Sequence, residues 1–88
     1  MRYIINGDFL CRNLTGIERF AYEICNRLDA LVESGTVGIF VPANARVIPE
    51  YKNIQLFVSE KTLVSFPRWI QFVYGKFLKK HKATGIDF

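Results

Sequence analysis

The residues best placed to do chemistry gather in one short segment near the start of the chain, between an apolar run and an amphipathic stretch. They carry amide, hydroxyl and guanidinium groups or no side chain at all: Asn6, Gly7, Arg12, Thr15, Gly16 and Arg19. A glycine at a helix start lets a ligand approach the exposed N–H groups, and nearby arginines add positive charge, so the segment suits a phosphate or another anion. The alternative is structural, because Thr15 and Glu18 fit a capping box that satisfies the helix start by itself.

This segment lacks the two common nucleotide-binding motifs. Neither G-x-G-x-x-G nor G-x-x-x-x-G-K-[ST] occurs in it, so it predicts neither a dinucleotide site nor a triphosphate loop. Other reactive side chains are few: Cys11, Cys25 and the single histidine His81. They are too few for a disulfide framework, a catalytic triad or a metal set. We therefore expect no catalytic residue, no metal and no cofactor in this chain.

Apolar runs predict the strands that position the segment. Consecutive apolar residues indicate strands buried on both faces, which is typical of parallel sheets covered by helices. These runs lie at residues 2–7, 37–41 and 54–58, and the pattern predicts that a further strand opens at residues 86–88. Because that last strand has only begun at Phe88, we expect residues 1–88 to be part of a larger domain.

Two stretches with apolar residues three and four apart predict helices. The first begins after a Thr15 cap and ends before Gly35, and the second covers residues 66–82 and ends before Gly85. The expected core face of the first helix is Ile17, Phe20, Ala21, Ile24, Leu28 and Leu31. The expected core face of the second helix is Trp69, Ile70, Val73, Tyr74 and Phe77.

The order strand, helix, strand, strand, helix, strand predicts an α/β fold, a Rossmann-like sandwich with a mostly parallel sheet. The connector at residues 43–53 is short for a crossover between parallel strands, so the direction of the third strand stays open. Ligands of such sheets bind at the carboxyl ends of the strands. The loop at residues 7–16 lies at that edge, which places the anion site there.

The composition excludes several classes of protein. The chain has 88 residues, a net charge of +4 and half of its residues apolar, so it is neither disordered nor a nucleic-acid arm. It contains no apolar stretch of the roughly 20 residues that span a membrane, and its start lacks a signal-peptide pattern. We therefore expect a cytoplasmic protein that binds no nucleic acid.

The second predicted helix carries a basic face with aromatic neighbours. Arg68, Trp69, Lys76 and Lys79 could rest on an anionic membrane surface, at the inner face of the membrane. The alternative is that its apolar face covers the sheet while the lysines keep the chain in solution. A partial sheet would also expose an edge strand and helix faces, so we expect the isolated chain to form a homodimer.

Two stretches resemble the start of a family 4 glycosyltransferase of the two-domain GT-B type. They are Asn-Gly-Asp-Phe-Leu at residues 6–10 and Leu-Thr-Gly-Ile-Glu-Arg-Phe-Ala-Tyr-Glu-Ile at residues 14–24. The family commonly has Asn/Asp-Gly-Arg-Phe-Leu in its first strand, followed by Thr-Gly-hydrophobic-x-Arg-aromatic. The match is close except at Asp8, where the family usually has arginine. Residues 37–42 are similar to its second strand, and residues 67–71 loosely to a later helix.

The resemblance implies the acceptor-side part of an enzyme that transfers a sugar from a nucleotide-sugar donor to a glycan or a lipid-linked acceptor, as in polysaccharide biosynthesis. It would place Thr15 and Gly16 near the donor diphosphate. It would place Asn6, Gly7, Arg12 and Arg19 near the cleft and the acceptor. The acidic E-x7-E pair of the family belongs to the other domain, so the resemblance implies that this chain is inactive alone. The alternative function is a small non-catalytic module that binds an anionic ligand or a protein partner.

Overall fold

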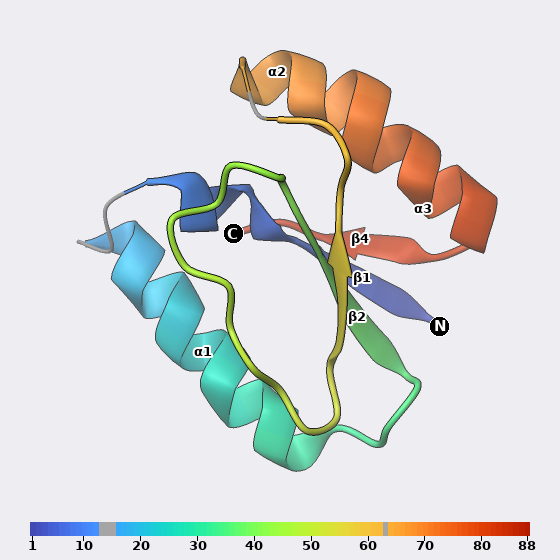
Figure 1. Cartoon of the computed structure of the whole chain (residues 1–88). Helices are drawn as coiled ribbons and strands as arrows, with labels where there is room; N and C mark the ends of the chain where they lie inside the picture. Colours follow the sequence, from blue (N-terminus) through green and yellow to red (C-terminus); the bar gives the residue numbers. More distant parts are fainter. Residues whose placement is uncertain (13–15, 63) are drawn as a thin grey trace.

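Four parallel strands form the sheet. A computed structural model describes residues 1–12, 16–62 and 64–88 of the chain. The strands are β1 (Tyr3–Asn6), β2 (Val37–Val41), β3 (Gln55–Val58) and β4 (Thr84–Ile86). They lie in the order β3-β2-β1-β4, and each neighbouring pair is parallel (Figure 1). The α/β prediction is thereby confirmed, and the third strand, whose direction the sequence left open, is parallel to the others.

Helical segments and one long connector cover both faces of this sheet. A 3₁₀ turn η1 (Gly7–Cys11) follows β1 and leads toward α1 (Ile17–Leu31). A second, continuous helical stretch consists of α2 (Phe66–Arg68), the π-helical turn η2 (Trp69–Tyr74) and α3 (Gly75–His81). In Figure 1, α1 and the connector at residues 42–54 lie on one side of the sheet, and α2 to α3 lie on the other. Every residue of β2 is accordingly buried.

The crossover from β2 to β3 is made by this connector, which contains no helix. The Asp29 carboxylate, near the end of α1, accepts hydrogen bonds from the backbone N–H groups of Lys52, Asn53 and Ile54 at 2.8–2.9 Å. Burial tends to raise the pKa of Asp29, but these donors outweigh it and the pKa lies below its usual value. One carboxylate thus anchors a coil that would otherwise leave backbone groups unsatisfied, and a short crossover becomes compatible with parallel strands.

The buried face of α1 differs from the predicted one. Ala21 and Cys25 are fully buried against the sheet, whereas Phe20 is 63% and Leu31 82% exposed. The predicted core positions at Phe20 and Leu31 were therefore wrong. The helix is rotated so that two small side chains, Ala21 and Cys25, face the strands, which lets it lie close to them. Ile24 lies on the helix surface between the buried pair Ala21 and Cys25 and the exposed pair Phe20 and Leu31, and it is only part-buried.

The second helix packs through an aromatic cluster. Trp69 is 1% exposed and stacks on Phe40 of β2, with ring centroids 5.2 Å apart, and Phe77 stacks on the same ring at 3.9 Å. The π turn explains how Trp69 and Tyr74, five residues apart, are buried together, because its hydrogen bonds join residues i and i+5. Ile70 was predicted in the core and is 40% exposed, since the wider turn rotates it outward.

The end of this helix agrees with the predicted range 66–82 to within one residue, but Gly85 has a different role from the predicted one. The last helical residue is His81, Lys82 follows it in the left-handed conformation (φ 51°), and Gly85 lies in β4. A Cβ atom on Gly85 would lie 2.7 Å from the Tyr74 hydroxyl. That hydroxyl donates to the Ile4 carbonyl of β1 and accepts from the Ile86 N–H of β4. The glycine is therefore required by a close approach and not by a helix end.

Candidate functional site

The candidate site lies at the edge of the sheet where β1 and β4 end, and Asn6 is its centre. The Asn6 side chain is fully buried. Its Oδ1 accepts from the Trp69 indole Nε1 at 2.8 Å and from the Asp8 backbone N–H at 3.2 Å. Its Nδ2 donates to Asp87 Oδ1 at 3.3 Å. One amide therefore joins the carboxyl ends of two strands to the helix on the far face of the sheet.

Two carboxylates face this edge, one from each strand end. Asp8 is nearly buried in η1, at 8% exposure, while Asp87 is exposed. Burial and the neighbouring Asp87 charge raise the pKa of Asp8, and the Arg12 charge and hydrogen bonds from Asn6 and Phe9 offset part of this rise. The edge thus presents hydrogen-bond acceptors beside aromatic rings, since Phe9 meets Phe88 edge-to-face at 6.3 Å.

The raised pKa of Asp8 predicts a measurable pH dependence. The folded state holds the proton more tightly than the unfolded chain, so folding stability falls as the pH rises from the usual value of 3.8 through the raised one. We expect Asp8→Asn to remove this fall, so that the free energies of unfolding of the wild type and the variant diverge as the pH rises. Urea unfolding of both proteins between about pH 3 and pH 7 measures it. Parallel stability curves would contradict the assignment.

Arg12 connects the first loop to both helical layers. Its Nη1 lies 3.1 Å from Glu18 Oε2 at the start of α1, and its guanidinium lies 3.9 Å from the centre of the Phe66 ring at the start of α2. Glu18 thus pairs with an arginine side chain. Arg12 is exposed, so its remaining N–H groups can reach a ligand at the sheet edge.

The start of α1 differs from the predicted capping box. Gly16 is the residue that precedes the helix, with φ 55°, and it supplies no side-chain cap. The cap predicted at Thr15 lies outside the described residues. The positive φ of Gly16 is one that side-chain-bearing residues rarely adopt. The first backbone N–H groups of α1 consequently receive no side-chain acceptor from Gly16.

The other predicted residues occupy separate places. Gly7 begins η1 beside Asn6, where a Cβ atom would lie 2.7 Å from the Phe40 carbonyl oxygen. Arg19 pairs with Glu23 along α1 at 3.5 Å, outside the Asn6 contacts. Arg68, Lys76 and Lys79 are exposed on the second helix. Trp69 is buried and stacks on Phe40, so its prediction as a core residue is confirmed and its alternative place on that exposed surface is wrong.

Sequence patterns missed three members of the site. Asp8 was noted only as a departure from a family motif, Asp87 only as part of an opening strand, and Trp69 only as a core or membrane residue. Parallel strands end at the same edge, so a polar residue directly after each predicted strand is a usable signal. Asp8 satisfies it, because it follows the predicted strand at residues 2–7, whereas Asp87 lies inside the strand predicted at residues 86–88 and follows only the observed β4. The Trp69 contact depends on the π turn, which no hydropathy pattern indicates.

The site contains no set of metal ligands in the part of the chain that the structure describes, where no three His, Cys, Asp or Glu side chains gather.

Burial and the Asp8 charge raise the pKa of Cys11, although Arg12 partly counters them, so its thiol stays protonated at neutral pH. An open hollow of about 250 Å³ adjoins the site between the β3 end and the second helix. Its lining includes Ser65, Arg68 and Trp69.

Comparison with protein-family models, with curated proteins and with solved structures finds no match to this chain. Among the described residues, no helix combines the length and the apolar character needed to cross a bilayer. The site is therefore defined by its own geometry: an amide hub, two carboxylates, one arginine and flanking aromatic rings at the carboxyl edge of a parallel sheet.

Proposed function

We propose that this edge binds a sugar acceptor, and that the chain is the acceptor-side segment of a GT-B glycosyltransferase. The observation that carries the proposal is the pair Asp8 and Asp87, held by Asn6 beside aromatic rings. Carboxylates are strong acceptors for hydroxyl groups, and aromatic side chains line sites for ring-shaped ligands. The transferred sugar would come from a nucleotide sugar, and the acceptor would be a glycan or a lipid-linked sugar.

The charges at the edge favour a division between two subsites. Two carboxylates repel a diphosphate, so the position of Asp8 and Asp87 favours the neutral, hydroxyl-rich acceptor. Arg12 and the start of α1 at Gly16 form the more positive side, which suits donor phosphates. We propose that a second domain holds most of the donor, so this chain alone does not transfer sugar.

Titration of the ¹⁵N-labelled chain with methyl glycosides and short oligosaccharides tests the acceptor site. We expect the sugars to shift the signals of Asp8 and the Trp69 indole, with dissociation constants in roughly the millimolar range. Asp8→Asn and Asp87→Asn should each weaken the binding several-fold, because each removes a charged acceptor. Glu60→Gln, after β3 at the same sheet edge, is the matched control. Sugars that leave every signal unmoved would refute the acceptor site.

The alternative function is a non-catalytic module for an anionic ligand or a protein partner. It is favoured by Arg12 and by Gly16, where an added Cβ atom would meet no atom of the described residues within 4 Å. Pyrophosphate titration in the same experiment separates the two functions. Shifts at Arg12 and Gly16 with pyrophosphate, and none with sugars, would support the anion module over the acceptor site.

We further propose that the outer surface of the second helix rests on an anionic membrane at the cytoplasmic face, where a lipid-linked acceptor would be found. Residues 61–86 contain six Lys and Arg residues and no Asp or Glu. Phe72, 53% exposed, lies one helical turn from both Arg68 and Lys76. Lys76→Gln with Lys79→Gln should reduce co-sedimentation with anionic liposomes, and Arg2→Gln is the control. Equal binding to neutral liposomes would contradict it.

A further inference from the structure

A stripe of apolar side chains runs along one flank of α1, beside the face that packs on the sheet. We call Phe20, Ile24 and Leu31 the α1 stripe. Phe20 is 63% exposed, Leu31 is 82% exposed, and Ile24 is part-buried. Spacings of four and seven residues align the three side chains along the helix. Large apolar side chains that gather on a surface favour a covering partner.

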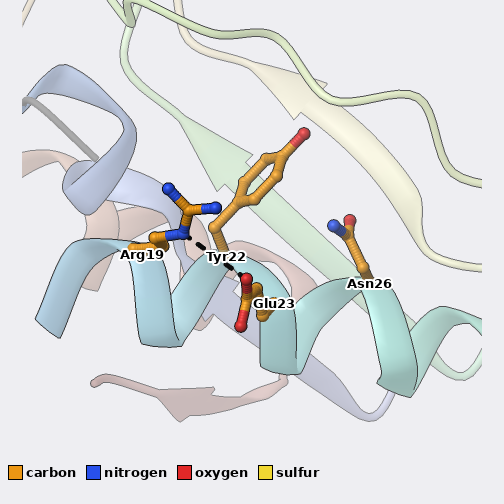
Figure 2. Close-up of a pocket in the computed structure, with 4 residues that line it drawn as sticks. All are labelled: Arg19, Tyr22, Glu23 and Asn26. Carbon is orange, nitrogen blue, oxygen red and sulfur yellow. Dashed lines mark ion pairs between the residues drawn. The ribbon is translucent and has the colours of Figure 1, made fainter. Parts of the chain in front are cut away.

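Charges of both signs border the α1 stripe. Arg19 Nε lies 3.5 Å from Glu23 Oε1, as Figure 2 shows, and both side chains are well exposed. Open hollows of about 280 and 300 Å³ lie along the helix, and Glu23 lines both. Arg27 lies one turn beyond Glu23 and makes no ion pair within the described part of the chain. The border therefore carries an acidic residue between two basic ones.

We propose that the α1 stripe is the contact between two copies of this chain, with their α1 helices antiparallel about a two-fold axis. In this arrangement Phe20 lies opposite Leu31 of the second copy, and Ile24 lies opposite the aliphatic stem of Arg27. The two-fold axis makes each contact occur twice, so both copies use the same surface patch. Glu23 of each copy meets Arg27 of the other, which adds two ion pairs at the rim of the apolar contact.

A second copy fits this surface better than a bilayer or a nucleic acid would. Both of those partners require a surface of one sign, whereas Glu23 sits between Arg19 and Arg27. The surface rich in lysine belongs to the helix on the opposite face of the sheet. One helix per copy makes a small interface, so the dimer is weak, with a dissociation constant of about 10 μM or higher.

Charge exchange tests the arrangement. Glu23→Arg places arginines at both positions, and Arg27→Glu places glutamates at both, so each variant repels its own copies. We expect each dimer dissociation constant to rise at least about tenfold. In an equimolar mixture of the two variants, every Glu meets an Arg, so the mixture should dimerise again. Sedimentation equilibrium of each variant, the mixture and the wild type measures this over a concentration series.

Each outcome decides the proposal. Recovery of the dimer in the mixture supports the antiparallel contact, and Phe20→Ser should abolish the dimer while Phe72→Ser, on the other helix, leaves it unchanged. Three results would overturn it: a monomeric wild type at about 1 mM, a dimer that both single variants retain, or a mixture that stays monomeric while the wild type dimerises. Circular dichroism of each variant verifies that the helices remain folded.

Discussion

Replacing Trp69 by alanine is expected to lower the free energy of unfolding by about 3–5 kcal/mol. The side chain is 1% exposed, stacks on Phe40 and donates its indole N–H to Asn6. Its loss therefore opens a cavity between helix and sheet and leaves the buried Asn6 oxygen with one donor fewer. An 88-residue chain has a total stability of about 4–13 kcal/mol, so this one substitution takes a large share of it.

The control for this experiment is Trp69→Phe. Phenylalanine keeps an aromatic ring against Phe40 but has no N–H, so the expected loss is smaller, about 1–3 kcal/mol. Urea unfolding followed by circular dichroism measures all three proteins. Equal losses in the two variants would mean that the hydrogen bond to Asn6 carries the whole effect and the stack carries none. A loss below about 1 kcal/mol in Trp69→Ala would contradict the burial of this side chain.

Replacing Asn6 by leucine is expected to cost about 2–5 kcal/mol of stability. Leucine has a similar size, but it offers no acceptor to the Trp69 indole or the Asp8 N–H and no donor to Asp87. Two donors, one of them on a fully buried ring, are then left without their partner. Sugar binding should fall as well, because Asn6 holds the Asp87 carboxylate in place at the edge.

Asn6→Asp separates the hydrogen bonds from the charge. It keeps an oxygen for Trp69 but places a third carboxyl group beside Asp8 and Asp87. Burial and two like charges would raise the pKa of the new carboxyl, so the variant should be least stable at neutral pH and regain stability as the pH falls. Unfolding measured at neutral and acid pH tests this. A destabilisation that does not change with pH would show that Asn6 acts by shape alone.

β1 and β2 were predictable because each is built on a run of consecutive apolar residues, which parallel strands need when both faces of the sheet are covered. β3 was found despite Gln55, whereas β4 (Thr84–Ile86) was predicted only in part, at residues 86–88, because Thr84 and Gly85 give no apolar signal.

The buried face of α1 was not predictable from the sequence. Hydropathy favours Phe20 and Leu31 for the core, whereas close packing on the sheet selects Ala21 and Cys25. The exposed apolar side chains of α1 form a second line about 90° from the buried one, and a helix with two apolar lines has no single predicted face.

The site was predictable in part. The first loop and the carboxyl edge follow from general rules for parallel sheets, and Asn6, Gly7 and Arg12 do lie there. The other half of the site comes from residues 63 and 81 positions further along the chain, Trp69 and Asp87. Their contact with Asn6 depends on the placement of β4 next to β1 and on one π turn. Neither feature leaves a local pattern in the sequence.

The Tyr74 hydroxyl that bridges β1 and β4 also makes the hydrogen bonding of β4 depend on the helix. The Tyr74 hydroxyl, which belongs to the second helix, accepts a hydrogen bond from Ile86 of β4 and donates one to Ile4 of β1. β4 therefore has its full set of hydrogen bonds only when that helix is packed on the sheet. β4 has three residues and contributes the Asp87 carboxylate directly after them. It is therefore the segment that can open and close while β1, β2 and β3 stay paired. Detachment of this strand would separate Asp87 from Asp8 without unfolding the core, so the acceptor site that we propose would depend on a local opening equilibrium.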